Sequence, residues 1–189
     1  ITYWKEAAKG GVMIYSYYMG MYLDDGYTPR FYPELAAEKI AHWHELGVKG
    51  IYWCGGGEKW GTEGPTYYVI GRMAKNPSCD WRKAYAEYMK LTFADAAPAM
   101  TAYYDTLYAR LARYRDPDKD WVLAGIGEDG KMLHYKSGYS NQTWLTIYTE
   151  EALTELQGHL DAARKQAGED KKAQGWIRLA QITYDQYAL

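Results

Sequence analysis

Apolar positions in the N-terminal part of the chain follow two patterns that alternate along the sequence. Residues 12–19 are apolar or aromatic at almost every position, which is typical of a strand covered on both faces in a parallel sheet. Residues 34–46 carry apolar side chains at helical spacing, with Pro33 suited to the first turn and Gly47 to the stop. Residues 48–54 then repeat the strand pattern. This order predicts one βαβ unit with two parallel strands side by side.

Helical spacing dominates the rest of the chain, with one interruption. A helix is predicted to open at Pro65, and the next two helices are predicted to begin at the capping residues Asp80 and Asp95. Residues 121–137 contain two short apolar runs around a turn signal, which predicts a β-hairpin. A last pair of helices is predicted after Thr149, the third capping residue.

These elements predict a fold class between α/β and mostly α. Residues 1–118 would hold the two strands and a helical extension, residues 119–148 a hairpin-like excursion, and residues 149–189 a terminal helix pair packed on the same core. At 189 residues the chain is shorter than a complete eight-stranded β/α barrel, which needs about 250 residues. Because the sequence starts at Ile1, we expect a fragment of a longer protein.

The composition argues against two classes of partner and favours a third. A net charge of −2, with Lys and Arg scattered among acids, gives no attraction to nucleic acid. No apolar run approaches the ~20 residues of a membrane-spanning helix, so we expect a soluble chain without membrane contact. The 21 Tyr and 8 Trp outnumber 2 Phe. Because Tyr and Trp combine a ring with a polar tip, this bias favours half-wet surfaces and ligand clefts.

Neither the cysteines nor the histidines form a recognisable metal pattern. Cys54 and Cys79 lack metal-ligand spacing and are too few for a disulfide framework. Free thiols are favoured for both cysteines. A disulfide between them, formed in an oxidising compartment, is the alternative. His42 and His44 are two positions apart on a predicted helix, so they point in different directions. We expect no metal and no cofactor.

The loop after the second strand carries the strongest candidate chemistry. Residues 55–57 are three glycines, which permit a sharp turn and the close approach of a ligand. Glu58 follows them and lies between Trp53 and Trp60. Loops at the carboxyl ends of parallel strands are where α/β proteins place their active sites. A carboxylate beside flat aromatic faces suits a sugar, and the structural alternative is a tight turn with an exposed glutamate.

Glycoside cleavage generally needs two carboxyl groups that flank the scissile bond. Glu58 and Glu63 are the predicted catalytic carboxylates. Asp24 and Asp25, in the loop after the first strand, are predicted to contact the substrate. Each of these residues also has a structural alternative. Glu63 would stabilise the N-terminus of a helix, and the two aspartates would form a turn.

Three aromatic residues are predicted to contact the substrate, because the C–H faces of a pyranose stack on flat rings. They are Trp60, Tyr22 and Trp53. Packing against the interior is an equal alternative for Trp60 and Tyr22. For Trp53, which lies inside the predicted strand, packing is the favoured interpretation.

Weakly specific aromatic and turn motifs, spread over nearly the whole chain, resemble those of a known family. They occupy residues 47–52, 67–73, 76–81, 96–104 and 147–151. With these motifs the chain resembles the bacterial family called domain of unknown function 4838. That family includes glycoside hydrolase family 163 enzymes and is similar to α-glucuronidase barrels.

The resemblance implies a fold, a location and a partner. The first ~60 residues would be the last two strands of a β/α barrel, with a helical extension packed on it. Members act on glycans outside the cytoplasm, so a secreted or periplasmic protein is expected. The N-terminal part of the barrel would be the partner of this chain, which alone would be inactive. Glu58 carries over only as a residue that lines the cleft.

Three functions therefore stay open from the sequence. The leading prediction is a glycoside hydrolase-like protein that acts on or binds glycans through its strand-end loops. The first alternative is a non-catalytic carbohydrate-binding or surface-assembly protein, which needs no carboxylate pair. The second is a helical protein-interaction module, in which tyrosine-rich helices form the interface.

Overall fold

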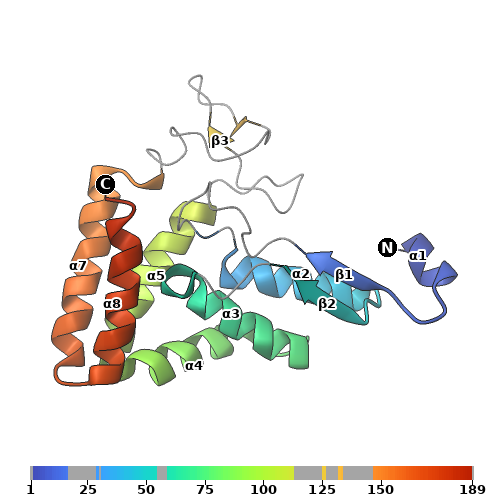
Figure 1. Cartoon of the computed structure of the whole chain (residues 1–189), viewed down its shortest axis with the longest axis horizontal. Coiled ribbons are helices and arrows are strands. Elements are labelled where there is room, and N and C mark those ends of the chain that lie inside the picture. Colours follow the sequence, from blue (N-terminus) through green and yellow to red (C-terminus); the bar gives the residue numbers. More distant parts are fainter. Residues whose placement is uncertain are drawn as a thin grey trace.

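A computed structural model describes residues 2–16, 29, 31–54, 59–112, 125–126, 132–133 and 147–188. The described part is mostly helical, with a small parallel sheet at one end and a helical hairpin at the other (Figure 1). No barrel is evident in it, because the parallel sheet has two strands there. None of its helices is both long and apolar enough to cross a membrane.

The predicted βαβ unit is confirmed. Strand β1 (Met13–Ser16) and strand β2 (Gly50–Trp53) pair in parallel, with Met13 opposite Gly50 and Ser16 opposite Trp53. Helix α2 (Pro33–Glu45) connects them and starts with its proline in the first turn, as expected from the missing N–H. Gly47 has a φ of 77°, the left-handed conformation that ends a helix.

Among the residues that the structure describes, one face of the sheet packs against the core, which corrects the prediction that β1 is covered on both faces. The buried side chain of Ser16 points inward, and Ile51 and Trp53 pack against the core. In contrast, Met13 and Tyr15 are 68% and 54% exposed. An apolar run alone does not show how many faces are covered, because that depends on segments distant in sequence.

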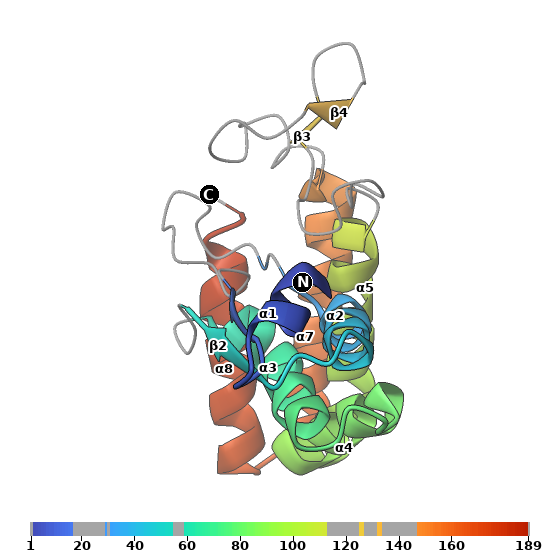
Figure 2. The same ribbon diagram turned by 90° about the vertical axis from the view of Figure 1, so that its right-hand side faces the viewer.

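Most of the remaining helices pack against one another in a single cluster beside the sheet (Figure 2). Helix α1 (Thr2–Ala7) precedes β1. Helix α3 (Trp60–Lys75), helix α4 (Trp81–Phe93), the 3-10 turn η2 (Ala94–Ala96) and helix α5 (Ala97–Ala112) follow β2. Helix α7 (Glu150–Ala167) and helix α8 (Lys171–Asp185) form the terminal hairpin.

The helix starts test the predicted capping residues. Asp80 accepts a hydrogen bond from the backbone N–H of Arg82, and Thr149 accepts one from Ala152, so both caps are confirmed. The prediction that Asp95 caps a helix is wrong, because Asp95 lies inside the 3-10 turn η2 and α5 starts two residues later.

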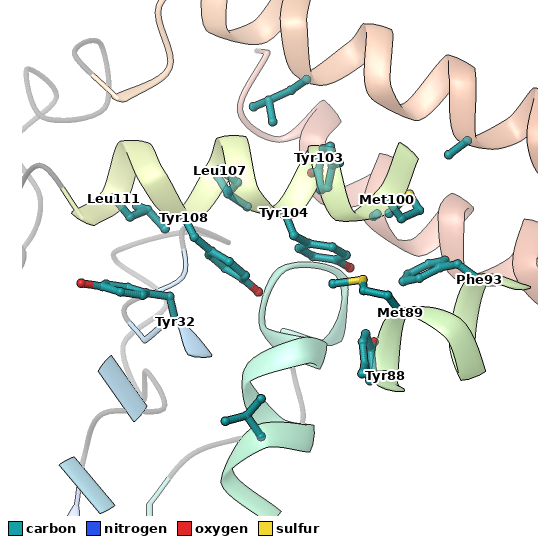
Figure 3. Close-up of a cluster of buried hydrophobic side chains, with 14 of the residues drawn as sticks. Tyr32, Tyr88, Met89, Phe93, Met100, Tyr103, Tyr104, Leu107, Tyr108 and Leu111 are labelled. Carbon is teal, nitrogen blue, oxygen red and sulfur yellow. The ribbon is translucent and has the colours of Figure 1, made fainter. Parts of the chain in front are cut away.

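The core is unusually rich in buried tyrosines (Figure 3). Tyr103 and Tyr104 on α5 are at most 1% exposed, and α5 packs against α4 and α7. The ring of Tyr108 stacks on that of Tyr104 with 5.8 Å between centroids. The abundance of tyrosine therefore serves the interior as well as the surface.

A short β-hairpin is also present where the sequence predicted one. Strand β3 (Gly125–Ile126) pairs antiparallel with strand β4 (Met132–Leu133). The predicted turn between them lies outside the described residues.

Candidate functional site

The candidate site is the first turn of α3, which follows β2 along the chain. Cys54, the residue after β2, still donates its backbone N–H to the Ser16 carbonyl at 2.7 Å, which extends the ladder. Helix α3 begins at Trp60, five residues before the predicted start at Pro65. This turn therefore begins close, in sequence, to the carboxyl end of a parallel strand pair, the usual position for chemistry in α/β proteins.

The early start of α3 is possible because Pro65 lies within the helix without leaving an unsatisfied group. Proline has no N–H, so the Gly61 carbonyl four residues before it loses its helical partner. The Tyr104 hydroxyl of α5 donates to that carbonyl at 3.1 Å. The Tyr108 hydroxyl donates to the neighbouring Thr62 carbonyl at 2.6 Å. Two buried phenols thus hold the first turn of α3 in place.

Two glycines let this turn approach its neighbours closely. A Cβ at Gly61 would overlap the Thr183 hydroxyl and the Leu179 carbonyl of α8. A Cβ at Gly64 would overlap the Tyr88 hydroxyl of α4. Because a helix interior otherwise disfavours glycine by roughly 1 kcal/mol, close packing is the physical reason for both residues.

Glu63 is fully buried in this turn, with 0% exposure. The Tyr67 hydroxyl, one helical turn later, donates to its Oε2 at 2.7 Å. Burial raises the pKa of the nearby Tyr108 phenol well above its usual range, and the negative charge of Glu63 contributes to the same shift. In this conformation the Glu63 carboxylate does not touch solvent, so a substrate would not reach it.

Trp60 supplies the exposed aromatic surface of the site. Trp60 is 38% exposed, and its ring stands edge-on to Tyr67 with 5.0 Å between centroids. Trp176 of α8 supports it from a second direction, at 6.2 Å and an interplanar angle of 57°. We call these three residues the Trp60 platform. Tyr67 joins the platform to Glu63, since its ring touches Trp60 and its hydroxyl binds the carboxylate.

The structure brings together some of the predicted site residues and separates others. Trp60 and Glu63 share the first turn of α3. Trp53 packs inward, with its ring 5.7 Å from Phe31 and 5.8 Å from Trp43, as favoured from its place in the strand. Four predicted residues lie outside the described part of the chain, namely Tyr22, Asp24, Asp25 and Glu58.

Two members of the platform were missed from the sequence. Tyr67 lies four residues after Glu63 in a predicted helix, so the helical spacing could have indicated their contact. Trp176 had no such signal, because only the packing of α8 on α3 places it beside Trp60.

The described residues do not assemble a metal centre. Among them, no group of three or more His, Cys, Asp or Glu side chains is placed to hold a metal ion. Cys54 and Cys79 are both half-buried, and the two do not form a disulfide. The Sγ of Cys79 instead lies 3.3 Å from the Sδ of Met73.

The chain was compared with family models, curated proteins and solved structures, and nothing matches it.

Proposed function

We propose that the chain binds glycans at the Trp60 platform. The observation that carries this proposal is a partly exposed indole supported on two sides by aromatic rings. Such a surface is rigid, so little side-chain entropy is lost when a flat ligand stacks on it. The weakly polar C–H face of a pyranose matches an indole in shape and polarity.

The position of the platform also supports a ligand site. Trp60 begins α3 seven residues after Trp53, the last residue of β2, and parallel α/β folds place their ligands at the carboxyl ends of their strands. The first turn is also held rigidly by Tyr104 and Tyr108 from α5. A site built on a fixed helix keeps its geometry better than one built on a loop alone.

Binding is favoured over hydrolysis by the environment of Glu63. A hydrolase needs two carboxyl groups beside the scissile bond, and Glu63 is buried and hydrogen-bonded to Tyr67. Glu58 as a catalytic acid stays a prediction of the sequence. If the protein releases reducing sugar from a glycan, Glu58→Gln should lower that turnover at least ~100-fold, with thermal stability unchanged.

The test is a glycan-binding measurement with a matched pair of tryptophan variants. Affinity electrophoresis against a panel of soluble polysaccharides identifies a ligand, and calorimetry gives its Kd. Trp60→Ala should weaken binding at least ~10-fold, while Trp60→Phe should retain part of the affinity. Trp81→Ala is the control, because that half-buried tryptophan lies at the start of α4 under Arg82.

Circular dichroism would verify that each variant is folded. Binding that is equally weakened by Trp81→Ala would contradict the proposal, as would a polysaccharide ligand whose affinity does not depend on Trp60. The proposal would also be contradicted if no polysaccharide of the panel slowed the migration of the protein in affinity electrophoresis.

A further inference from the structure

Helices α7 and α8 lie side by side, and a groove runs between them (Figure 1). Its volume is about 700 Å³, which is within the range of sites for small ligands. The lining is mostly polar and comes from both helices, with Arg164 on α7 and Lys171, Gln174, Arg178 and Gln181 on α8. No residue of the Trp60 platform lines this groove, so it is separate from the candidate glycan site.

Hydrogen bonds between the two helices fix the walls of the groove. The Gln174 Nε2 donates to the backbone carbonyls of Arg164 at 3.0 Å and of Gly168 at 2.9 Å. The Arg164 guanidinium donates to the side chain of Gln181, and to Asp161 at 2.8 Å. A site whose side chains are already held in place loses less conformational entropy when it binds a ligand.

Lys171 and Arg178 are the cations of the groove that are available to a ligand. Neither forms a hydrogen bond or an ion pair with another residue in the described part of the chain. Gly175 lies between them, about one helical turn from each. No atom of the described residues lies within 4 Å of its Cβ position, so the helix backbone there is open to a ligand.

The charges of the groove are arranged with the cations toward its middle. The two acids that line it lie near the ends of α8, since Glu169 precedes the helix and Asp185 is its last residue. Asp185 also accepts a hydrogen bond from the Gln181 Nε2 at 2.7 Å. The middle therefore presents the two unpaired cations of α8, and two cations that converge on one space favour an anion with more than one charge.

We propose that the middle of this groove, above Gly175, binds a phosphate group. A phosphate ester carries about −1.5 to −2 charges at neutral pH and three acceptor oxygens. The planar guanidinium of Arg178 can bind two of these oxygens at once, and the ammonium of Lys171 supplies a compact charge on a flexible stem. This inference goes beyond glycan binding and does not depend on it.

The first test is an NMR titration of the isotope-labelled chain with inorganic phosphate, with acetate at the same ionic strength as the reference. Phosphate should shift the amide resonances of Gly175 and its neighbours until they saturate, whereas acetate should not. The variant Lys171→Gln with Arg178→Gln should raise the phosphate Kd at least ~10-fold, because it removes two charge-assisted hydrogen-bond donors.

The matched control is Lys83→Gln with Lys90→Gln. It removes two exposed lysines of α4 that have the same spacing along their helix as Lys171 and Arg178, and it changes the net charge equally. This control should leave the Kd unchanged. If it weakened binding as much as the α8 variant, the attraction would be a general effect of charge and the proposal would be overturned.

A third variant keeps every charge and fills the open stretch of α8. Gly175→Leu should also raise the phosphate Kd at least ~10-fold, because its side chain occupies the space between Lys171 and Arg178. Leucine favours a helix more than glycine does, so circular dichroism should show that the helix is retained. Undiminished binding by this variant would overturn the placement of the phosphate, as would a titration in which no α8 resonance shifts or acetate binds as tightly.

A phosphate group is shared by soluble esters and by lipid headgroups, and two further ligands distinguish these sources. Sedimentation with vesicles of phosphatidic acid and phosphatidylcholine, abolished by Lys171→Gln with Arg178→Gln, would assign the site to a lipid headgroup. Saturable binding of glycerol phosphate without sedimentation would assign it to a soluble ester. Binding of neither would overturn the proposal.

Discussion

The Tyr104 hydroxyl donates to the Gly61 carbonyl at 3.1 Å, and this is the carbonyl that Pro65 leaves without a helical partner. Helix α5 thus replaces a hydrogen bond that α3 cannot form within itself. The exchange allows a proline inside a continuous helix, which otherwise costs about 3 kcal/mol. It also couples the candidate glycan site to the core.

Removing this hydroxyl should destabilise the protein. Tyr104→Phe leaves the buried Gly61 carbonyl without a partner, so the free energy of unfolding should fall by about 1–2 kcal/mol in urea titration. Tyr103→Phe on the same helix is the matched control, because the buried hydroxyl of Tyr103 has no hydrogen-bond partner among the described residues. That variant should be neutral or slightly stabilising. Equal losses in the two variants would contradict the role given to Tyr104.

Alanine substitution should separate two kinds of helical glycine. Gly61→Ala should destabilise the fold by several kcal/mol, because the new methyl meets the backbone carbonyl of Leu179. Gly175→Ala in α8 should stabilise it by roughly 0.5–1 kcal/mol, since nothing lies within 4 Å of its Cβ position. Thermal denaturation of the two variants measures both effects. A stable Gly61→Ala variant would show that α3 and α8 are packed less closely.

The role of Glu63 can be tested through stability. Glu63→Ala removes the acceptor of the Tyr67 hydroxyl and leaves a cavity, so we expect a loss of about 2–3 kcal/mol. Glu87→Ala removes a half-exposed carboxylate paired with Arg72 and should cost less than about 1 kcal/mol. If Glu63→Ala retained full stability but lost glycan turnover, the catalytic prediction would replace the structural one.

The buried tyrosines should make the protein sensitive to alkali. Burial raises the pKa of several phenols above the ordinary value near 10, and these belong to Tyr88, Tyr103, Tyr104, Tyr108 and Tyr187. A raised folded pKa means that the unfolded chain releases its protons first. Stability should therefore be intact below pH 10 and fall above it, by up to about 1.4 kcal/mol per pH unit for each phenol.

Absorbance of ionised tyrosine, recorded together with circular dichroism, measures this effect. The buried phenols should ionise in the same step in which the helical signal is lost. Full ionisation of all tyrosines in a chain that keeps its helical signal would disprove the link.

The sequence by itself determined the elements whose causes are local. The βαβ order, the start of α2 at Pro33 and the caps at Asp80 and Thr149 follow from spacing, a fixed φ and side chains that bind nearby N–H groups. The early start of α3 could not be predicted in this way. It depends on a hydroxyl of Tyr104, which is remote in sequence.

Only the tertiary structure decided which surfaces are buried. It enclosed Glu63, set Trp176 beside Trp60 and left Tyr15 and Tyr52 exposed on the sheet. Each of these outcomes depends on which distant helix covers a given face, and an apolar pattern records only that a face can be covered. Local chemistry thus specified the helices and strands, whereas packing between them specified the site.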